Sequence, residues 1–343
     1  MKYSIIVPVY NRPDEVDELL QSLTTQSYKD FEVVIVEDGS TNKCKDVCNK
    51  YADVLALRYY DKPNSGPGQS RNYGAERANG EWFIILDSDV VLPEGYLESV
   101  EQALTREREE SRPIMAWGGP DASHSSFTPV QKAISYSMTS YFTTGGIRGG
   151  KKKLDKFFPR SFNMGIKREV YIELGGFSKM RFGEDIDFSY RIVEAGYKTA
   201  LIPDAWVWHK RRTDFRKFWR QVYNSGIARI NLEKRHPGTL KLVHLLPTVF
   251  TVGIFGLLLL FLIGLLTGLC WLTCLSATPI LLYCLLICTD SAIVNKSVKV
   301  GLLSVPAAFV QLMGYGCGFM ESWWKRCVLK KDEFQAYEKN FYK

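Results

Sequence analysis

Short apolar runs alternate with stretches of helical period along the first 90 residues. The apolar runs 4–9, 31–36, 54–60 and 82–86 predict buried strands. Between them, residues 14–23 carry leucine and valine at helical spacing, and further helices are expected near 42–52 and from residue 70. Because strands alternate with helices, the pattern predicts an α/β fold with a parallel, doubly wound, Rossmann-like sheet.

Polar residues directly follow three of these apolar runs. They are Tyr10-Asn11, Glu37-Asp38 and Asp87-Ser88-Asp89. Ligands of doubly wound sheets bind at the carboxyl ends of the strands. Three polar strand ends that converge on one edge therefore predict a binding site there.

Asp87 and Asp89 are the most informative pair in this set. Two carboxylates separated by one residue at the end of a buried strand repel each other unless a cation lies between them. A hard divalent ion, with a diphosphate completing its coordination, suits such a pair. The sequence therefore predicts a Mg²⁺ or Mn²⁺ site, although a solvated turn explains many isolated Asp-x-Asp pairs.

The second half of the chain has a different composition. Residues 242–289 contain no charged side chain, and a second uncharged run covers 300–320. About 20 apolar residues cross the hydrocarbon core of a bilayer. We expect membrane spans near 244–266 and 269–289, with a less regular third at 300–320, and a basic tail at 321–343. A purely soluble enzyme, a disordered chain and a small disulfide-stapled scaffold are excluded.

The formal charge of +7 matters through its placement. Lysines and arginines before residue 242 and after residue 294 flank the first two spans, so the positive-inside rule places residues 1–240 in the cytoplasm. Residues 213–241 alternate aromatic and basic side chains, which is typical of a helix in the membrane interface rather than of a nucleic-acid surface. If 300–320 also spans, the basic tail lies outside, against the rule; if it is re-entrant or interfacial, the tail stays inside.

A combination of motifs resembles glycosyltransferase family 2. It consists of Pro8-Val9-Tyr10-Asn11, Glu37-Asp38-Gly39-Ser40, Ser70-Arg71-Asn72 and Asp87-Ser88-Asp89, in this order and spacing. The resemblance covers roughly residues 1–210 and implies a GT-A domain at 1–212, a nucleotide-diphosphate sugar donor, a divalent metal and an inverting displacement. Glu37 departs from the aspartate that is more usual in the family.

The resemblance also implies roles for single residues. Pro8, Tyr10, Asn11, Glu37, Asp38, Arg71 and Asp87 would surround the donor nucleotide. Asp89 and Asp87 would hold the metal, with His209 as a further ligand, and Lys210 and Arg211 would offset charge on the diphosphate or meet anionic lipid.

Glu184 and Asp185 open an amphipathic stretch after Gly183. An inverting transfer needs a carboxylate that takes the proton of the acceptor hydroxyl. The family's Glu-Asp motif supplies it, so Asp185 is expected to be the base, with Glu184 as the alternative or as an acceptor-orienting group. Helix capping is a compatible reading of the same residues, since acidic groups stabilise a helix N-terminus by about 0.3–1 kcal/mol.

These expectations lead to a membrane-bound inverting glycosyltransferase. Its partners would be a UDP- or GDP-sugar, a lipid-linked or growing glycan acceptor and the bilayer, at the cytoplasmic face of a bacterial inner membrane. A polyprenyl-phosphate glycosyltransferase is the near alternative. A catalytically silent membrane scaffold with a sugar-nucleotide fold is the alternative from another class. A processive synthase is disfavoured, because residues 221–225 do not match its Gln-x-x-Arg-Trp signature.

Overall fold

A computed structural model of the chain describes residues 1–108, 113–122, 127–144, 157–210 and 213–333. The chain divides into two compact units. Residues 1–124, 151–210 and 334–343 form one, called here the α/β unit. Residues 125–150 and 211–333 form the other, called the helical unit.

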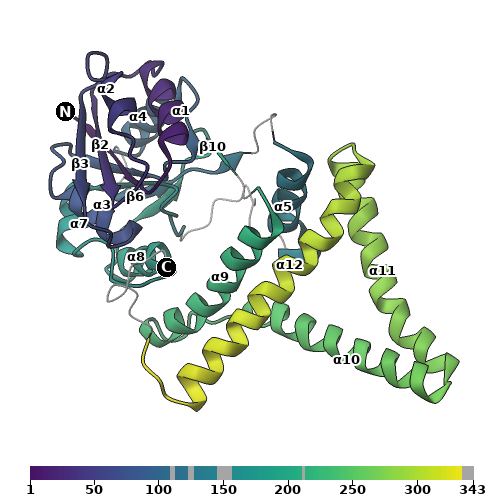
Figure 1. Cartoon of the computed structure of the whole chain (residues 1–343). Coiled ribbons are helices and arrows are strands. Elements are labelled where there is room, and N and C mark those ends of the chain that lie inside the picture. Colours follow the sequence, from purple (N-terminus) through teal and green to yellow (C-terminus); the bar gives the residue numbers. More distant parts are fainter. Residues whose placement is uncertain (109–112, 123–126, 145–156, 211–212, 334–343) are drawn as a thin grey trace. The chain divides into compact units, whose positions relative to one another are not determined.

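Within the described residues, a seven-stranded sheet is the centre of the α/β unit (Figure 1). Its order is β3-β2-β1-β4-β8-β6-β9. The strands are β1 (Tyr3–Val9), β2 (Phe31–Asp38), β3 (Leu57–Lys62), β4 (Trp82–Leu86), β6 (Ala116–Gly118), β8 (Asn163–Lys167) and β9 (Thr199–Leu201). A smaller sheet has the order β5-β10-β7, from β5 (Val90–Val91), β7 (Asp121–Ala122) and β10 (Val207–His209).

The predicted α/β class is confirmed, with one difference in strand direction. β1 runs parallel to β2 and β4, as the alternating pattern indicates. However, β8 is antiparallel to both β4 and β6, so the sheet is mixed. Its sequence, Asn-Met-Gly-Ile-Lys, is a short run of mixed polarity that carries no signal of direction.

Helices cover both faces of the sheet because alternate strand residues face opposite sides. The helices of this unit are α1 (Pro13–Thr24), α2 (Lys45–Asn49), α3 (Pro67–Ala75), α4 (Tyr96–Arg108), α7 (Arg168–Glu173) and α8 (Glu184–Glu194). Ile5, Val33 and Ile84 pack on one face of the sheet with α1 and α4, whereas Ile6, Val34 and Phe83 pack on the other with α7 and α8. The helix expected at 42–52 is thus shorter, and the strand expected at 54–60 begins at Leu57.

The helical unit holds the apolar half of the chain. Its helices are α5 (Pro129–Thr139), α6 (Tyr141–Thr144), α9 (Phe215–Arg235), α10 (Leu246–Thr267), α11 (Cys270–Val294) and α12 (Val298–Trp323), with a 3₁₀ turn at Leu242–His244 and a π-helical turn at Trp324–Val328. Within the described part of the chain, three helical segments are long and apolar enough to cross a membrane: Leu242–Thr267, Cys270–Val294 and Val298–Val328. Gly268 ends α10 in the left-handed region, at φ 71°, where the sequence indicated a turn.

The helical unit also takes in residues that the sequence assigned to the catalytic domain. α5 lies between β7 and β8 in the chain, but its Ile134 and Met138 pack with Phe218 and Val222 of α9. Its Tyr136 donates a hydrogen bond of 2.5 Å to Asp290 of α11. The boundary at residue 212 therefore does not separate the two units, because this inserted segment buries its apolar face among the C-terminal helices.

Candidate active site

The carboxyl edge of the central strands gathers three potential metal ligands. β4 ends at Leu86, so Asp87 and Asp89 emerge at this edge. β10 then pairs antiparallel with β5, which sets His209 opposite Val90. The Lys210 amide also donates to the Asp89 carbonyl, at 3.0 Å. This small sheet explains how a histidine 120 positions further along the chain reaches Asp89.

Asp87, Asp89 and His209 each offer one ligand atom, and these atoms lie within 4.8 Å of one another. The His209 Nε2 atom is 3.2 Å from Asp89 Oδ1, and its ring stacks on Phe162 with centroids 5.0 Å apart. Two carboxylates and one imidazole suit a divalent ion such as Mn²⁺. The residues present therefore fit the predicted metal.

A cation already contacts this cluster in the structure. The Arg12 guanidinium forms an ion pair with Asp89, a contact that no sequence motif predicted. Burial opposes the charge of Arg12, but the Asp89, Glu15 and Asp87 carboxylates raise its pKa above the ordinary value. Arg12 therefore offsets part of the negative charge that a divalent ion would meet.

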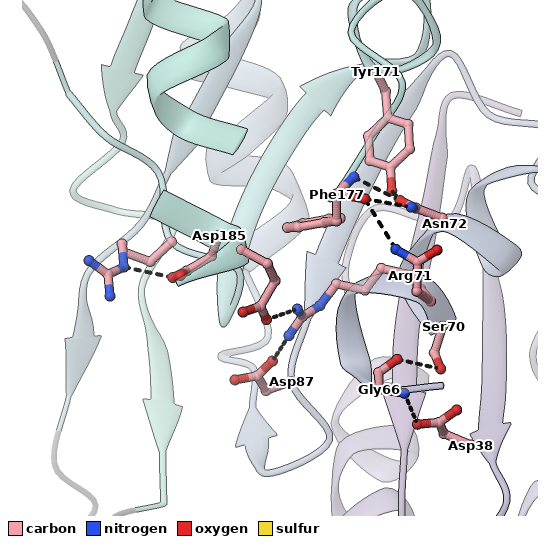
Figure 2. Close-up of polar contacts among 12 residues, drawn as sticks. Asp38, Gly66, Ser70, Arg71, Asn72, Asp87, Tyr171, Phe177 and Asp185 are labelled. Carbon is pink, nitrogen blue, oxygen red and sulfur yellow. Dashed lines mark hydrogen bonds and ion pairs between the residues drawn. The ribbon is translucent and has the colours of Figure 1, made fainter. Parts of the chain in front are cut away.

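Arg71 links the metal cluster to the acidic pair of α8. Its side chain is buried, and one guanidinium nitrogen lies 2.8 Å from Asp87 while another lies 3.1 Å from Glu184 (Figure 2). Burial opposes its charge, yet the neighbouring carboxylates raise the pKa of Arg71. The sequence predicted that this arginine lies near the nucleobase or the diphosphate of a donor. In the structure its guanidinium lies between two carboxylates.

The two acidic residues of α8 have opposite pKa shifts. Burial raises the pKa of Glu184 to about 7, and Asp185 adds to the shift while Arg71 opposes it. Burial also disfavours the Asp185 carboxylate, but Arg160 and Arg71 keep its pKa below the ordinary value. Arg160 donates a hydrogen bond of 2.8 Å to Asp185 (Figure 2). Asp185 is thus held ionised at neutral pH, as a proton acceptor must be.

Asn72 organises the loop that leads to α8. Its side-chain oxygen accepts hydrogen bonds from the Tyr171 hydroxyl at 2.7 Å and the Phe177 amide at 2.8 Å, and its amide donates to the Phe177 carbonyl at 2.8 Å (Figure 2). A Cβ on Gly176, which has a φ of 65°, would lie 2.4 Å from the Asn72 oxygen. The Gly-Gly-Phe stretch is therefore needed for the close approach of this loop to α3.

The two acidic side chains at the end of β2, Glu37 and Asp38, are buried and hydrogen-bonded. Asp38 accepts from the amides of Ser65 and Gly66, each at 2.8 Å, and pairs with Lys62. Glu37 accepts from the Cys44 amide at 2.8 Å. These contacts shape the two loops at the carboxyl edge, a role that the sequence did not indicate.

The segment after β1 lies beside the same loops. Pro8 and Tyr10 are half-buried, and Asn11 is exposed with a φ of 54°. The Asn11 side-chain oxygen accepts hydrogen bonds from the amides of Thr41 and Asn42, at 2.9 and 2.8 Å. Asn11 thus joins the ends of β1 and β2.

The predicted diphosphate residues are only partly described. The Lys210 ammonium pairs with Glu18 of α1, at 2.7 Å. Arg211 lies outside the described residues. Of the residues predicted to bind donor or metal, the structure brings Asp87, Asp89, His209 and Arg71 into one cluster.

Comparison with known proteins identifies the family of this fold and site. The family model described as glycosyl transferase family 2 matches residues 4–175, half of the chain. The chain belongs to this glycosyltransferase family, which confirms the resemblance of the four motifs.

Curated relatives share only part of their length with this chain. A glycosyltransferase of Haemophilus influenzae is 31% identical over 198 residues, covering 56% of this chain and 62% of the relative. A glycosyltransferase of Rickettsia felis is 32% identical over 148 residues, covering 43% and 23%. Glycosyltransferase GlyA of Streptococcus pneumoniae is 33% identical over 100 residues, covering 29% and 14%.

Solved structures have the same fold. The mannosyltransferase PcManGT from Pyrobaculum calidifontis, solved with GDP-Man and Mn²⁺, aligns with a TM-score of 0.57 and 16% identity over 95% of this chain and 88% of that one. Residues 1–349 of Staphylococcus aureus TarS align with a TM-score of 0.51 and 19% identity, covering 73% and 70%.

Proposed function

We propose that this protein is a membrane-bound, inverting, metal-dependent glycosyltransferase that moves a sugar from a nucleotide-diphosphate donor to a hydroxyl of a lipid-linked or growing glycan. The contact of Arg71 with both Asp87 and Glu184 carries the proposal. Asp87 and Glu184 each contact a different nitrogen of the planar Arg71 guanidinium. The contacting oxygen atoms of the two carboxylates therefore lie within roughly 9 Å of each other. A donor held at the metal cluster thus has its reacting carbon within reach of the acidic pair.

Asp87, Asp89 and His209 would hold a Mg²⁺ or Mn²⁺ ion, which would neutralise charge on the leaving diphosphate. Family membership and the structural neighbours support a sugar nucleotide as donor, since PcManGT was solved with GDP-Man and TarS with UDP-GlcNAc. Pro8, Tyr10, Asn11, Glu37 and Asp38 are proposed to form the nucleoside side of this site.

Asp185 is the proposed base of the transfer. Its carboxylate takes the proton of the acceptor hydroxyl while the hydroxyl oxygen attacks the anomeric carbon from the face opposite the diphosphate. The bond from that carbon to the diphosphate oxygen breaks, and the diphosphate leaves with the electron pair. Arg160, which contacts Asp185, keeps the carboxylate ionised before the acceptor binds.

The apolar helices support a location in a membrane. α10 and α11 expose many leucines, such as Leu259, Leu266 and Leu282, each about 60–80% exposed. We propose that α10 and α11 cross the inner membrane as a helical hairpin. The catalytic residues then face the cytoplasm, because basic residues flank both ends of this hairpin on one side of the membrane.

A polyprenyl phosphate is the alternative acceptor. A phosphate oxygen is already ionised near neutral pH and needs no base. The ionised state of Asp185 therefore favours a hydroxyl acceptor.

Transfer of a labelled sugar in native membranes tests the proposal. Membranes with the full-length protein are incubated with radiolabelled UDP-, GDP- and dTDP-sugars, and lipid and glycan fractions are counted. We expect label from one donor in a product from which mild acid does not release the labelled sugar as a free monosaccharide. Mild acid cleaves a polyprenyl phosphate or diphosphate linkage but leaves the new glycosidic bond to a hydroxyl intact. Asp185→Asn should abolish transfer, and Asp53→Asn, on an exposed loop, should not. A product that Asp185→Asn still makes, and from which mild acid releases the free labelled monosaccharide, would contradict a hydroxyl acceptor.

A further inference from the structure

α12 contacts the two preceding apolar helices at opposite ends of its length. A Cβ on Gly301 would lie 2.5 Å from the Cys288 carbonyl oxygen, in the last turns of α11. A Cβ on Gly316 would lie 2.6 Å from the Pro247 carbonyl oxygen, in the first turn of α10. The two glycines are fifteen positions apart, which corresponds to about 22 Å along the helix. α12 therefore bridges the end of α11 and the start of α10, as the third side of a triangle (Figure 1).

The two bridged ends lie on one side of any membrane that the hairpin crosses. α10 and α11 meet at their other ends, where a Cβ on Gly264 would be 2.8 Å from the Thr273 amide nitrogen. If α10 leads away from the cytoplasm, α11 returns to it. A helix that joins the start of α10 to the end of α11 then runs along the membrane surface and does not cross the bilayer.

α9 lies along α12 and carries charges that exclude it from hydrocarbon. Cβ atoms on Gly314 and Gly318 would be 2.5 Å from a Val222 methyl and 2.0 Å from the Tyr223 carbonyl oxygen. Further on, Arg326 donates to the Asn231 side chain at 3.0 Å, so the contact continues to the end of α9.

If α12 crossed the bilayer, α9 would cross beside it. The charged residues of α9 are Arg216, Lys217, Arg220, Arg229, Glu233, Lys234 and Arg235. Each charged side chain near the centre of a bilayer costs about 2.5–3.5 kcal/mol on insertion scales. The pairing of α9 with α12 therefore argues strongly against a third span.

The exposure of α12 also differs from that of the hairpin. Between residues 300 and 322, only Leu302 and Pro306 are exposed among the described side chains. Trp323 and Trp324, which are 48% and 53% exposed, follow at its end, beside Lys325 and Arg326. Exposed tryptophans beside cations are typical of the headgroup layer.

We propose that α12 lies in the cytoplasmic headgroup layer together with α9, and that the protein crosses the membrane twice. The basic residues after α12 then face the same anionic lipid surface as those before α10 and after α11. These groups are Lys325, Arg326, Lys330 and Lys331; Lys234, Arg235 and Lys241; and Lys296 and Lys299. Each contributes about 1 kcal/mol near such a surface, and the positive-inside rule is satisfied throughout.

Cysteine labelling tests this topology and rests on the proposed membrane location. Three variants each keep one thiol: Cys270 at the α10–α11 turn, Cys327 after α12, and a cysteine introduced by Lys296→Cys between α11 and α12. An impermeant maleimide is applied to intact spheroplasts and to inverted vesicles. We expect Cys270 to react from the outside, and the thiols at 296 and 327 only in inverted vesicles. Labelling of Cys327 from the outside together with Cys270 would overturn the inference and leave the membrane location standing.

Two further measurements separate the possible failures. Release of the protein by alkaline carbonate would refute the membrane location, whereas labelling of Cys270 only from the inside would refute the proposed orientation; either result would refute the inference. For the chain with all native cysteines, reporters fused after Lys343 give an independent result. A fluorescent protein should fluoresce there and alkaline phosphatase should be inactive, and the reverse pattern would refute two spans.

Discussion

Replacing Arg71 by glutamine removes the guanidinium that contacts both Asp87 and Glu184. Both carboxylates are then left without this cation in a largely buried setting, since their side chains are 30% and 12% exposed. Removal of one partner from a buried ion pair costs about 3–5 kcal/mol. Because Asp87 is partly exposed, its share is screened by solvent. We therefore expect a loss near the lower end, about 3 kcal/mol.

Thermal unfolding of detergent-purified protein measures this loss. For a unit of about 150–250 residues, each kcal/mol shifts the Tm by about 2–4 °C, so Arg71→Gln should lower the transition by roughly 6–12 °C. Arg106→Gln, at an exposed position of α4, is the matched control and should leave the transition unchanged.

The double variant Arg71→Gln with Glu184→Gln identifies the group that causes the loss of stability. If an uncompensated carboxylate is responsible, neutralising Glu184 should recover about 1–2 kcal/mol of the loss. A Tm within about 3 °C of wild type for Arg71→Gln, or no recovery in the double variant, would show that Arg71 does not compensate a buried Glu184 carboxylate.

Three further predictions concern the base, the metal cluster and the helix packing. With Asp185 as the base and Mn²⁺ kept at a saturating concentration at each pH, kcat/KM should stay within about twofold between pH 8 and pH 5, because the lowered pKa of Asp185 keeps it ionised throughout. A fall below pH 7 that additional Mn²⁺ does not reverse would instead identify Glu184, whose pKa is about 7. Arg12→Gln should tighten Mn²⁺ binding about tenfold in calorimetry, since a charge-assisted contact worth about 1.5 kcal/mol no longer competes with the ion, and unchanged affinity would contradict that competition. Gly318→Val should cause aggregation in detergent, because its Cβ would lie 2.0 Å from a carbonyl oxygen of α9, whereas Gly256→Val, with open space around it, should remain monodisperse in gel filtration.

Local patterns were sufficient to predict the strands that form the site. β1, β2 and β4 are continuous apolar runs followed by polar residues, so both their positions and the edge where Asp87 and Asp89 emerge could be inferred. The direction of β8 could not, because its five residues carry no turn or periodicity that defines a partner.

Two of the arginines that contact the acidic residues, Arg12 and Arg160, lay beyond sequence reasoning. Arg12 reaches Asp89 across 77 positions, and Arg160 reaches Asp185 across 25. Such pairs depend on tertiary packing, and neither arginine belongs to one of the four motifs.

Metal-dependent turnover of a sugar nucleotide is the sharpest test of the proposed transferase. Purified protein is mixed with UDP-, GDP- and dTDP-sugars in Mn²⁺ or Mg²⁺, with and without chelator, and release of the nucleoside diphosphate is followed. We predict slow release from one donor that chelator abolishes, that Asp89→Ala loses and that the exposed control Asp53→Ala keeps. Absence of metal-dependent binding and turnover for every donor would contradict the assignment of Asp87, Asp89 and His209, and would favour a catalytically silent membrane scaffold.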